Sequence, residues 1–207
     1  MNMELKEIKE NIKKFFTWLW KSDSVLSWIV SLILAFLIVR FIFFPLLSLI
    51  LGTSLPLVVV ESSSMSHPGG FIGNTLGLQG SFDTWWLQVH DWYEERNITE
   101  QEAEKWKMRT GMEKGDIIVV SGYGKPKIGD IIIFNANQAH PIIHRIINKT
   151  TINNQVIYST KGDNNPEQLY VEKQIPEDAI VGKAVFKIPK LGWIKLIFVN
   201  IINLFRS

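Results

Sequence analysis

The sequence contains no cysteine. This absence excludes disulfide bonds and thiolate ligands for metals, and it leaves the redox compartment of the protein open. The chain also has almost no excess of charge of one sign: it contains 22 Lys and Arg residues and 20 Asp and Glu residues, which give a net charge of +2 at pH 7. Without a basic tract to neutralise phosphates, we expect no nucleic-acid partner. A chain of 207 residues has room for one compact domain beside a membrane anchor.

Tryptophan and long apolar stretches, by contrast, are plentiful. The eight tryptophans are many for this length, and tryptophan favours sites that are apolar at one end and wet at the other, such as membrane interfaces. The longest apolar stretch covers about residues 25–60. It is interrupted by Arg40, Pro45, Gly52 and Pro56.

The first part of this stretch predicts a membrane anchor. Residues 25–39 carry no charge, and with flanking residues they approach the roughly 20 needed to span a bilayer. We predict a transmembrane anchor and interfacial extension over residues 23–51, with Arg40 at the interface, because an arginine at mid-bilayer costs at least about 2.5 kcal/mol. The alternative is a longer, tilted helix from Val25 to Leu51 with Arg40 buried.

Residues 1–22 have the pattern of an amphipathic helix. Its charged residues are Lys6, Lys9, Lys13, Lys14 and Lys21 with Glu4, Glu7 and Glu10. Because this segment is mostly polar, we do not expect a cleaved secretory signal. Its slight positive excess favours a cytoplasmic N-terminus, with the following domain on the outer or luminal side.

A helical insertion is expected at about residues 69–111. Ser81 could cap a first helix, and Thr99 with Glu102 has the pattern of a capping box for a second helix that ends near Gly111. The first helix carries a stripe of Trp85, Val89, Trp92 and Arg96, with Trp86 and Tyr93 beside it. We favour packing of this stripe on its own domain, with docking on the membrane interface or on a partner as the alternatives.

After Met112 the sequence changes to short β-branched runs. These runs are residues 116–121, 130–135, 142–147 and 156–160, separated by polar turns. The pattern predicts a mainly β fold class, a small antiparallel sheet or barrel with the helical hairpin inserted, over residues 52–192. The apolar segment 193–207 is too short to span a membrane and predicts an interfacial or core helix.

Hydroxyl groups cluster directly after the apolar stretch, where residues 55–68 read Leu-Pro-Leu-Val-Val-Val-Glu-Ser-Ser-Ser-Met-Ser-His-Pro. A serine nucleophile needs a base to take its proton and donors to hold the oxyanion. Ser62 and Ser64 could supply the nucleophile and one donor. On its own, such a tract is more typical of a solvated turn.

Histidines and aspartates are present as candidate partners. The four histidines are His67, His90, His140 and His144. Strand alternation puts His144 on the face of Ile142 and Ile146, whereas we expect His67 and His90 at the surface, in a turn and a helix. His140 would not meet His144 on a strand, so we expect no metal site.

The aspartates share a simpler interpretation. Asp116, Asp130 and Asp163 each follow a glycine, and each could close a turn by accepting hydrogen bonds from backbone amides. The chain therefore offers Ser, His and Asp, but a catalytic triad is recognised by geometry and not by spacing.

The order of the motifs resembles type I signal peptidase, and most closely its archaeal and endoplasmic-reticulum branch. The motifs are Val-Val-Val-Glu-Ser-Ser-Ser-Met, Lys-Gly-Asp-Ile-Ile-Val-Val, Ile-Gly-Asp-Ile-Ile-Ile-Phe, Ile-Ile-His-Arg-Ile-Ile and Thr-Lys-Gly-Asp-Asn-Asn. The resemblance implies a serine endopeptidase without cofactors, with a β-rich catalytic domain outside the cytoplasm. It would be held by a single span in the cell membrane, or in the endoplasmic-reticulum membrane of a eukaryote. It would remove signal peptides from secretory preproteins, and its accessory subunits stay open.

By position in these motifs, Ser64 corresponds to the nucleophile. Ser62 corresponds to the residue that flanks the oxyanion hole, together with the Ser64 backbone. His144 stands where the bacterial branch has a lysine general base, and an imidazole works as a base near neutral pH without the desolvation that a lysine requires. Lys161 is the one nearby lysine that could substitute, and we interpret it as a turn residue.

The acidic residue is where the sequence departs most from the family. Related enzymes often carry a second acid some six residues after the Gly-Asp aspartate, a position that is Leu169 here. We therefore expect Asp163 to orient His144, with Glu167 as the second choice and Glu172 also nearby. A Ser-His dyad without an acid is a further option.

Substrates are expected to bind in extended form beside the apolar strand that runs from Leu57 to Glu61. Two other functions stay open. The chain could be a membrane-anchored peptide-binding relative without catalysis, or a peptidase of the same fold that acts on a different substrate. The altered serine motif, in which Ser63 replaces the usual Gly, keeps these alternatives in view.

Overall fold

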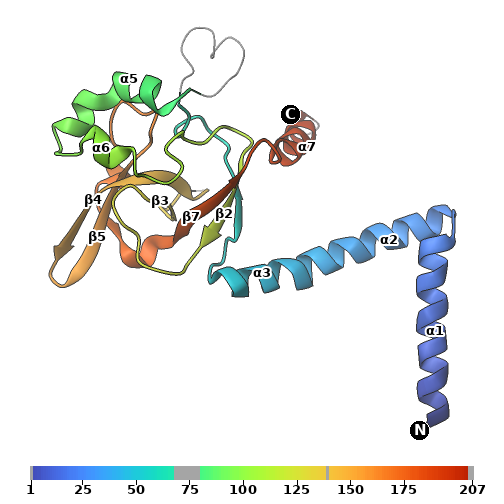
Figure 1. Ribbon diagram of the computed structural model, residues 1–207. Coiled ribbons are helices and arrows are strands. Elements are labelled where there is room, and N and C mark those ends of the chain that lie inside the picture. The colour runs from blue at the N-terminus through green and yellow to red at the C-terminus, as the bar shows by residue number, and fades with distance from the viewer. Residues whose placement is uncertain (1, 68–79, 139, 205–207) are drawn as a thin grey trace. The chain divides into compact units, whose positions relative to one another are not determined.

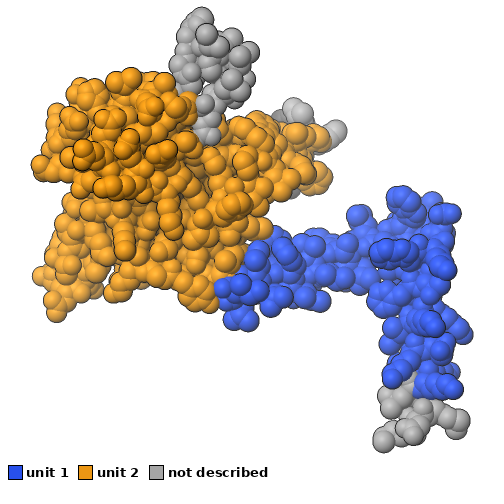
Figure 2. Space-filling model, viewed as in Figure 1, with its two compact units in different colours: residues 1–50 blue, residues 51–207 orange. Residues whose placement is uncertain are grey.

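The computed structural model describes residues 2–67, 80–138 and 140–204. The chain divides into two compact units, residues 1–50 and residues 51–207, shown in blue and orange in Figure 2. Each unit has its own architecture.

The first unit is helical (Figure 1). It consists of α1 (Asn2–Lys21), α2 (Val25–Ile38), a π-helical turn η1 (Val39–Phe43) and α3 (Phe44–Leu51). Ser24 caps α2 by accepting a hydrogen bond from the Ser27 amide at 3.2 Å.

The apolar helix does not end before Arg40. It continues through η1 and α3, so that Val25–Leu51 forms one helical stretch of 27 residues with a mean hydropathy of 2.6, long and apolar enough to cross a membrane. Its length is that of the longer helix in the alternative, while the position of Arg40 at the membrane interface stays a prediction. A physical reason is visible at Pro45, which lacks an N–H and whose ring would clash with the carbonyl four residues earlier; the wider π turn accommodates it.

The second unit is built on one antiparallel sheet of seven strands. The strands are β1 (Leu57–Val59), β2 (Ile117–Ser121), β3 (Ile131–Phe134), β4 (Ile142–Ile152), β5 (Gln155–Lys161), β6 (Ile175–Pro176) and β7 (Ile180–Ile188). Their order in the sheet is β1-β2-β7-β3-β4-β5-β6, and all neighbours are antiparallel. The predicted mainly β fold class is confirmed.

The core lies on both faces of the central strand β3. Ile131 and Ile133 belong to one buried cluster with Ile118 and Val120 of β2, while Ile132 and Phe134 belong to another cluster with residues of β4, β5 and β6. Because successive side chains of a strand point to opposite faces, a strand buried on both sides needs the continuous apolar run Ile-Ile-Ile-Phe that the sequence has.

The inserted helices are α5 (Phe82–Glu94) and α6 (Glu100–Ala103). Ser81 caps α5 and the capping box of Thr99 and Glu102 is present, as predicted. The second helix, however, ends at Ala103 instead of continuing to Gly111. The part of the expected insertion at residues 69–79 lies outside the described residues.

A tertiary contact explains the short second helix. The buried Arg145 guanidinium takes the carbonyls of Lys107 and Met108 as acceptors, at 3.1 and 3.2 Å. Met108 adopts a positive φ of 52°, which is not helical. These carbonyls therefore point to the arginine instead of continuing a helix.

The aromatic stripe of α5 packs on its own domain, as we favoured from the sequence. Trp85, Trp86 and Tyr93 are buried in one cluster with Ile98 and with Ile147 of β4. The insertion therefore covers the β4 side of the sheet (Figure 1).

Short helical segments complete the unit. They are the 3-10 turns η2 (Tyr170–Glu172) and η3 (Glu177–Ala179) and the C-terminal helix α7 (Trp193–Leu204). In α7, Leu196 is buried while Ile194 and Phe198 are exposed. Most of this helix is therefore not a core helix.

Candidate active site

The serine tract follows β1 and is held by its backbone. The Ser64 carbonyl accepts a hydrogen bond from the Asn164 amide at 2.8 Å, and the Met65 carbonyl accepts one from the Met112 amide at 2.7 Å. Gly162 lies so close that a Cβ there would come within 2.8 Å of the Ser64 carbonyl oxygen. These contacts fix the backbone on which the Ser64 hydroxyl is carried.

His144 comes from β4 and meets this serine. His144 is 3% exposed, and its Nε2 lies 2.9 Å from Ser64 Oγ. Its other ring nitrogen, Nδ1, is in hydrogen-bond contact with Glu172 Oε1. The structure thus brings together Ser64 and His144, which the sequence had placed 80 residues apart.

Glu172 is fully buried, and its carboxylate has partners on both oxygens. Oε2 accepts a hydrogen bond from the Leu169 amide at 2.7 Å, and Oε1 accepts one from the Thr160 hydroxyl at 3.2 Å. A buried carboxylate is costly unless hydrogen bonds compensate its lost hydration. The N-cap residue of η2 and the strand β5 supply these two bonds, and together they fix the carboxylate against His144.

We expected Asp163 to orient His144, but in the structure the carboxylate that contacts the His144 ring is that of Glu172. Asp163 Oδ1 accepts from Arg145 Nε at 2.8 Å and Oδ2 accepts from Arg145 Nη2 at 2.6 Å. Neighbouring residues of a strand point to opposite faces, so a side chain that meets Arg145 lies on the other side of β4 from His144. The second choice, Glu167, accepts from Trp92 Nε1 at 3.0 Å and is not the partner of the His144 ring.

His67 is the second correction, because it is not at the surface. It is 1% exposed, its Nε2 lies 3.0 Å from Asp163 Oδ2, and its ring stacks on Trp85 with 4.3 Å between the centroids. Burial lowers the pKa of His67 despite the hydrogen bond to Asp163, which raises it. His90 does lie on a helix and is partly exposed, as expected.

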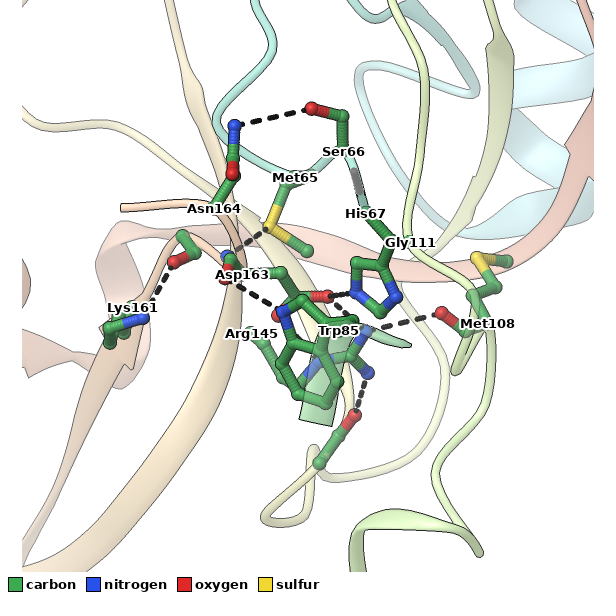
Figure 3. Close-up of polar contacts among 12 residues, drawn as sticks. Met65, Ser66, His67, Trp85, Met108, Gly111, Arg145, Lys161, Asp163 and Asn164 are labelled. Carbon is green, nitrogen blue, oxygen red and sulfur yellow. Dashed lines mark hydrogen bonds and ion pairs between the residues drawn. The ribbon is translucent and has the colours of Figure 1, made fainter. Parts of the chain in front are cut away.

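Figure 3 shows how His67, Trp85 and Arg145 surround Asp163. Arg145 is fully buried and also donates to the Gly129 carbonyl at 2.9 Å. Burial by itself raises the pKa of a carboxyl, but the paired Arg145 and the hydrogen bond from His67 lower the pKa of Asp163 far below its usual range. Asp163 is thus the ionised partner of a buried arginine. Asp116 and Asp130 differ from it: their carboxylates accept hydrogen bonds from backbone amides and close turns, as expected.

Lys161 is the last residue of β5 and not a turn residue. Its ammonium donates to the Gly162 carbonyl at 3.1 Å and lies over the rings of Trp92 and Tyr93, at 4.9 and 5.3 Å from their centroids. Burial lowers the pKa of Lys161 from 10.5 to about 8, although Asp163 and Glu172 raise it. Lys161 thus donates to a backbone carbonyl, whereas His144 is the basic group in hydrogen-bond contact with the Ser64 hydroxyl.

The remaining candidate is Ser62. Its hydroxyl is exposed and lies 3.1 Å from Ser64 Oγ. A donor at this place is close to where a carbonyl oxygen would lie after attack by Ser64. Across residues 2–67, 80–138 and 140–204, no group of three or more His, Asp or Glu side chains could hold a metal ion.

A serine, a histidine and a buried carboxylate joined by hydrogen bonds form the arrangement that serine hydrolases use. Here this arrangement stands on an antiparallel sheet in a chain with one apolar helix long enough to span a membrane.

Comparison with known proteins agrees with this class, although no protein-family model matches the chain. The chain is 28% identical over 98 residues to the signal peptidase complex catalytic subunit SEC11 of Candida tropicalis, covering 44% of this chain and 59% of that protein. The same subunit of Scheffersomyces stipitis is 29% identical over 98 residues with the same coverage, and that of Sclerotinia sclerotiorum is 28% identical over 99 residues, with 58% of its length covered.

Over this part of its length the chain is therefore similar to signal peptidase complex catalytic subunits, in agreement with the resemblance to type I signal peptidase. The match spans somewhat less than three fifths of the length of these relatives.

Proposed function

We propose that this protein is a membrane-anchored serine endopeptidase that removes N-terminal signal peptides from secretory preproteins. The observation that carries this proposal is the hydrogen-bonded line Ser64–His144–Glu172 in a chain homologous to signal peptidase catalytic subunits. Ser64 is the proposed nucleophile, His144 the general base and Glu172 the residue that orients the base.

The first chemical step follows from the tautomer that Glu172 favours. When Nδ1–H of His144 is donated to the carboxylate, the lone pair of Nε2 faces the Ser64 hydroxyl at 2.9 Å. Ser64 Oγ then attacks the scissile carbonyl carbon while Nε2 takes the hydroxyl proton. The buried carboxylate stabilises the imidazolium that forms.

The second half of the reaction uses the same groups in reverse. His144 gives its proton to the leaving amine, which leaves the signal peptide bound to Ser64 as an ester. A water molecule, deprotonated by Nε2, attacks this ester and releases the peptide. We assign the Ser62 hydroxyl and the Ser64 backbone amide to the oxyanion in both steps, because Ser62 Oγ lies 3.1 Å from the attacking oxygen.

Strand β1 is the proposed binding edge for substrate. It is one of the two edge strands of the sheet, paired with β2, and the chain passes from its end at Val59 directly to the serine tract. An extended peptide that adds to the free edge gains main-chain hydrogen bonds. Secretory preproteins and the lipid bilayer are thus the proposed partners, in the cell membrane or the endoplasmic-reticulum membrane, and the complex named for the relatives makes accessory membrane subunits a further proposal.

The test is cleavage of a preprotein with a standard signal peptide by the purified protein in liposomes. We expect product at the signal-peptide junction, and we expect Ser64→Ala and His144→Ala to lose it while they still bind the preprotein. A wild-type protein that binds the preprotein without cleaving it would favour a peptide-binding relative. Cleavage that survives Ser64→Ala would show that another residue is the nucleophile.

A further inference from the structure

An unpartnered apolar stripe runs along the N-terminal helix α1. Ile8, Ile12 and Phe15 recur at spacings of four and three residues, which places them on one face of a helix, and Phe16 lies beside them. These four side chains are between 44% and 54% exposed, and each is a large hydrophobic residue. A contiguous apolar face with four exposed large side chains is typical of a surface that binds a membrane or a partner.

Charged residues occupy the remainder of the helix. Lys9 and Lys13 are one turn apart. They lie next to the apolar stripe, on the side where Phe16 is its outermost residue. Glu7, Glu10 and Lys14 lie farther round, on the opposite face. A helix of 20 residues with one apolar face and flanking lysines has the composition of helices that lie in the plane of a membrane interface.

The corner between α1 and α2 is polar and internally bonded. The Ser27 hydroxyl donates to the Ser22 carbonyl at 2.7 Å and is itself 1% exposed, while Ser24 caps α2. At this corner the chain turns sharply, so that α1 leaves the direction of the apolar helix (Figure 1). This change of direction is the one that a helix needs if it is to run along the bilayer surface beside a membrane-crossing neighbour.

Tryptophans flank the corner on both sides. Trp20 near the end of α1 is 91% exposed and Trp28 in the first turn of α2 is 72% exposed. Exposed tryptophans next to a span are typical of the layer of lipid head groups. They place the corner at that depth, which is also the depth where the stripe of α1 would meet the acyl boundary.

We propose that α1 is an interfacial helix that lies on the bilayer surface at the N-terminal end of the Val25–Leu51 span. Ile8, Ile12, Phe15 and Phe16 enter the boundary between head groups and acyl chains, roughly 5–10 Å deep. Lys9 and Lys13 reach up to the lipid phosphates. The helix thus makes a second contact with the membrane, parallel to its surface, and it does not depend on the proposed peptidase activity.

The absence of native cysteine makes a direct test possible. In the full chain, Ile12→Cys and the matched control Glu10→Cys each carry one environment-sensitive fluorophore; these positions are two residues apart and face opposite sides of the helix. The labelled proteins are reconstituted in vesicles of phosphatidylcholine and phosphatidylglycerol. Emission, quenching by iodide in the water phase and quenching by nitroxide-labelled lipids are measured for each.

We expect a blue shift at position 12, strong quenching there by lipids with the nitroxide just below the head group, and a severalfold loss of iodide quenching relative to position 10. Equal iodide quenching at both positions would overturn the proposal, because the helix would then stand in water. A label at position 12 that is shielded from iodide but untouched by nitroxide lipids would also overturn it, since protein would cover the stripe. So would efficient disulfide-linked dimers of unlabelled Ile12→Cys, which would identify a second copy as the occupant.

Discussion

Two buried carboxylates, Glu172 and Asp163, sit on either side of strand β4. Glu172 contacts the ring of His144, whereas Asp163 forms two hydrogen bonds with the guanidinium of Arg145 and a third with His67. Their separation follows from the alternation of one strand, because His144 and Arg145 are consecutive. A single substitution at each carboxylate can therefore separate chemistry from folding.

For Glu172→Gln, we expect kcat for preprotein cleavage to fall by about 10³–10⁴-fold, because the neutral amide no longer fixes the tautomer of His144 or stabilises its charged form. For Asp163→Asn, we expect the free energy of unfolding to fall by about 3–5 kcal/mol, because Arg145 then stays buried without its anion. The two variants are compared by cleavage kinetics and by thermal unfolding. The assignment fails if Asp163→Asn, while folded, loses as much kcat as Glu172→Gln.

Lys161 predicts a pH dependence of stability. Burial lowers its pKa from 10.5 to about 8 in the folded protein, so the unfolded chain holds more protons between these two values. Stability from this group therefore rises as pH rises from about 8 to 10.5, and the cost of burying the charge is fully present below pH 8. A shift of this size corresponds to about 3 kcal/mol.

In Lys161→Met this cost is gone, so the variant is expected to gain stability over wild type at pH 7 and to lose most of that gain by pH 10.5. Chemical denaturation in detergent, followed by tryptophan fluorescence across this range, measures the difference. Lys149 is the control, because it lies over the ring of Tyr158 but is exposed. A stability difference between wild type and Lys161→Met that stays constant with pH would contradict the buried-charge explanation.

At the scale of elements, the sequence predicted those features that depend on local pattern. The cap at Ser81, the capping box of Thr99 and Glu102 and the strand expected at residues 130–135 all follow from spacing and residue type, and all are present, the last as β3. The contact between Ser64 and His144 was expected from the order of motifs, since no local pattern joins residues of β4 to the end of β1. Their catalytic roles stay predictions.

The carboxylate could not be found in the same way. The position at which the family resemblance led us to look for an acid is Leu169, and Glu172 reaches His144 because the turn η2 folds it back onto the amide of Leu169. Nothing in the sequence marks such a 3-10 turn, because its N-cap is a leucine and not a Ser, Thr or Asp. His67 was missed for a related reason: its burial depends on Trp85 and Asp163, which lie far away in the sequence.

For the C-terminal helix α7, the amphipathic pattern of the sequence predicts the helix but not what covers its apolar side. Its helical state is confirmed, and Leu196 is buried. Ile194, Ile197 and Phe198 remain on the exposed side. Lys195 forms an ion pair of 3.0 Å with Glu61, which directly precedes the serine tract. Because this pair is exposed to solvent, it contributes at most about 1 kcal/mol to the free energy of unfolding. That this helix lies at a membrane interface stays a prediction.

At the scale of the whole molecule, the serine, the histidine and the glutamate all belong to the unit of residues 51–207, which has its own core. The candidate span belongs almost entirely to the other unit. The proposed chemistry and the proposed attachment to the membrane therefore lie in separate parts of the chain, and we expect removal of one to leave the other intact.

Deletion of residues 1–50 is accordingly expected to leave a folded domain. Mild detergent is needed in this experiment, because the apolar side of α7 is exposed. A short soluble peptide that contains a signal-peptide junction should be cleaved with kcat close to that of the full chain, because Ser64, His144 and Glu172 are unchanged. Cleavage of preproteins inserted in liposomes should fall by about 10²-fold or more, since the enzyme and substrate no longer share one membrane and the effective concentration is lost. If both substrates lose cleavage equally while circular dichroism shows a folded sheet, the N-terminal helices must complete the active site as well as anchor it.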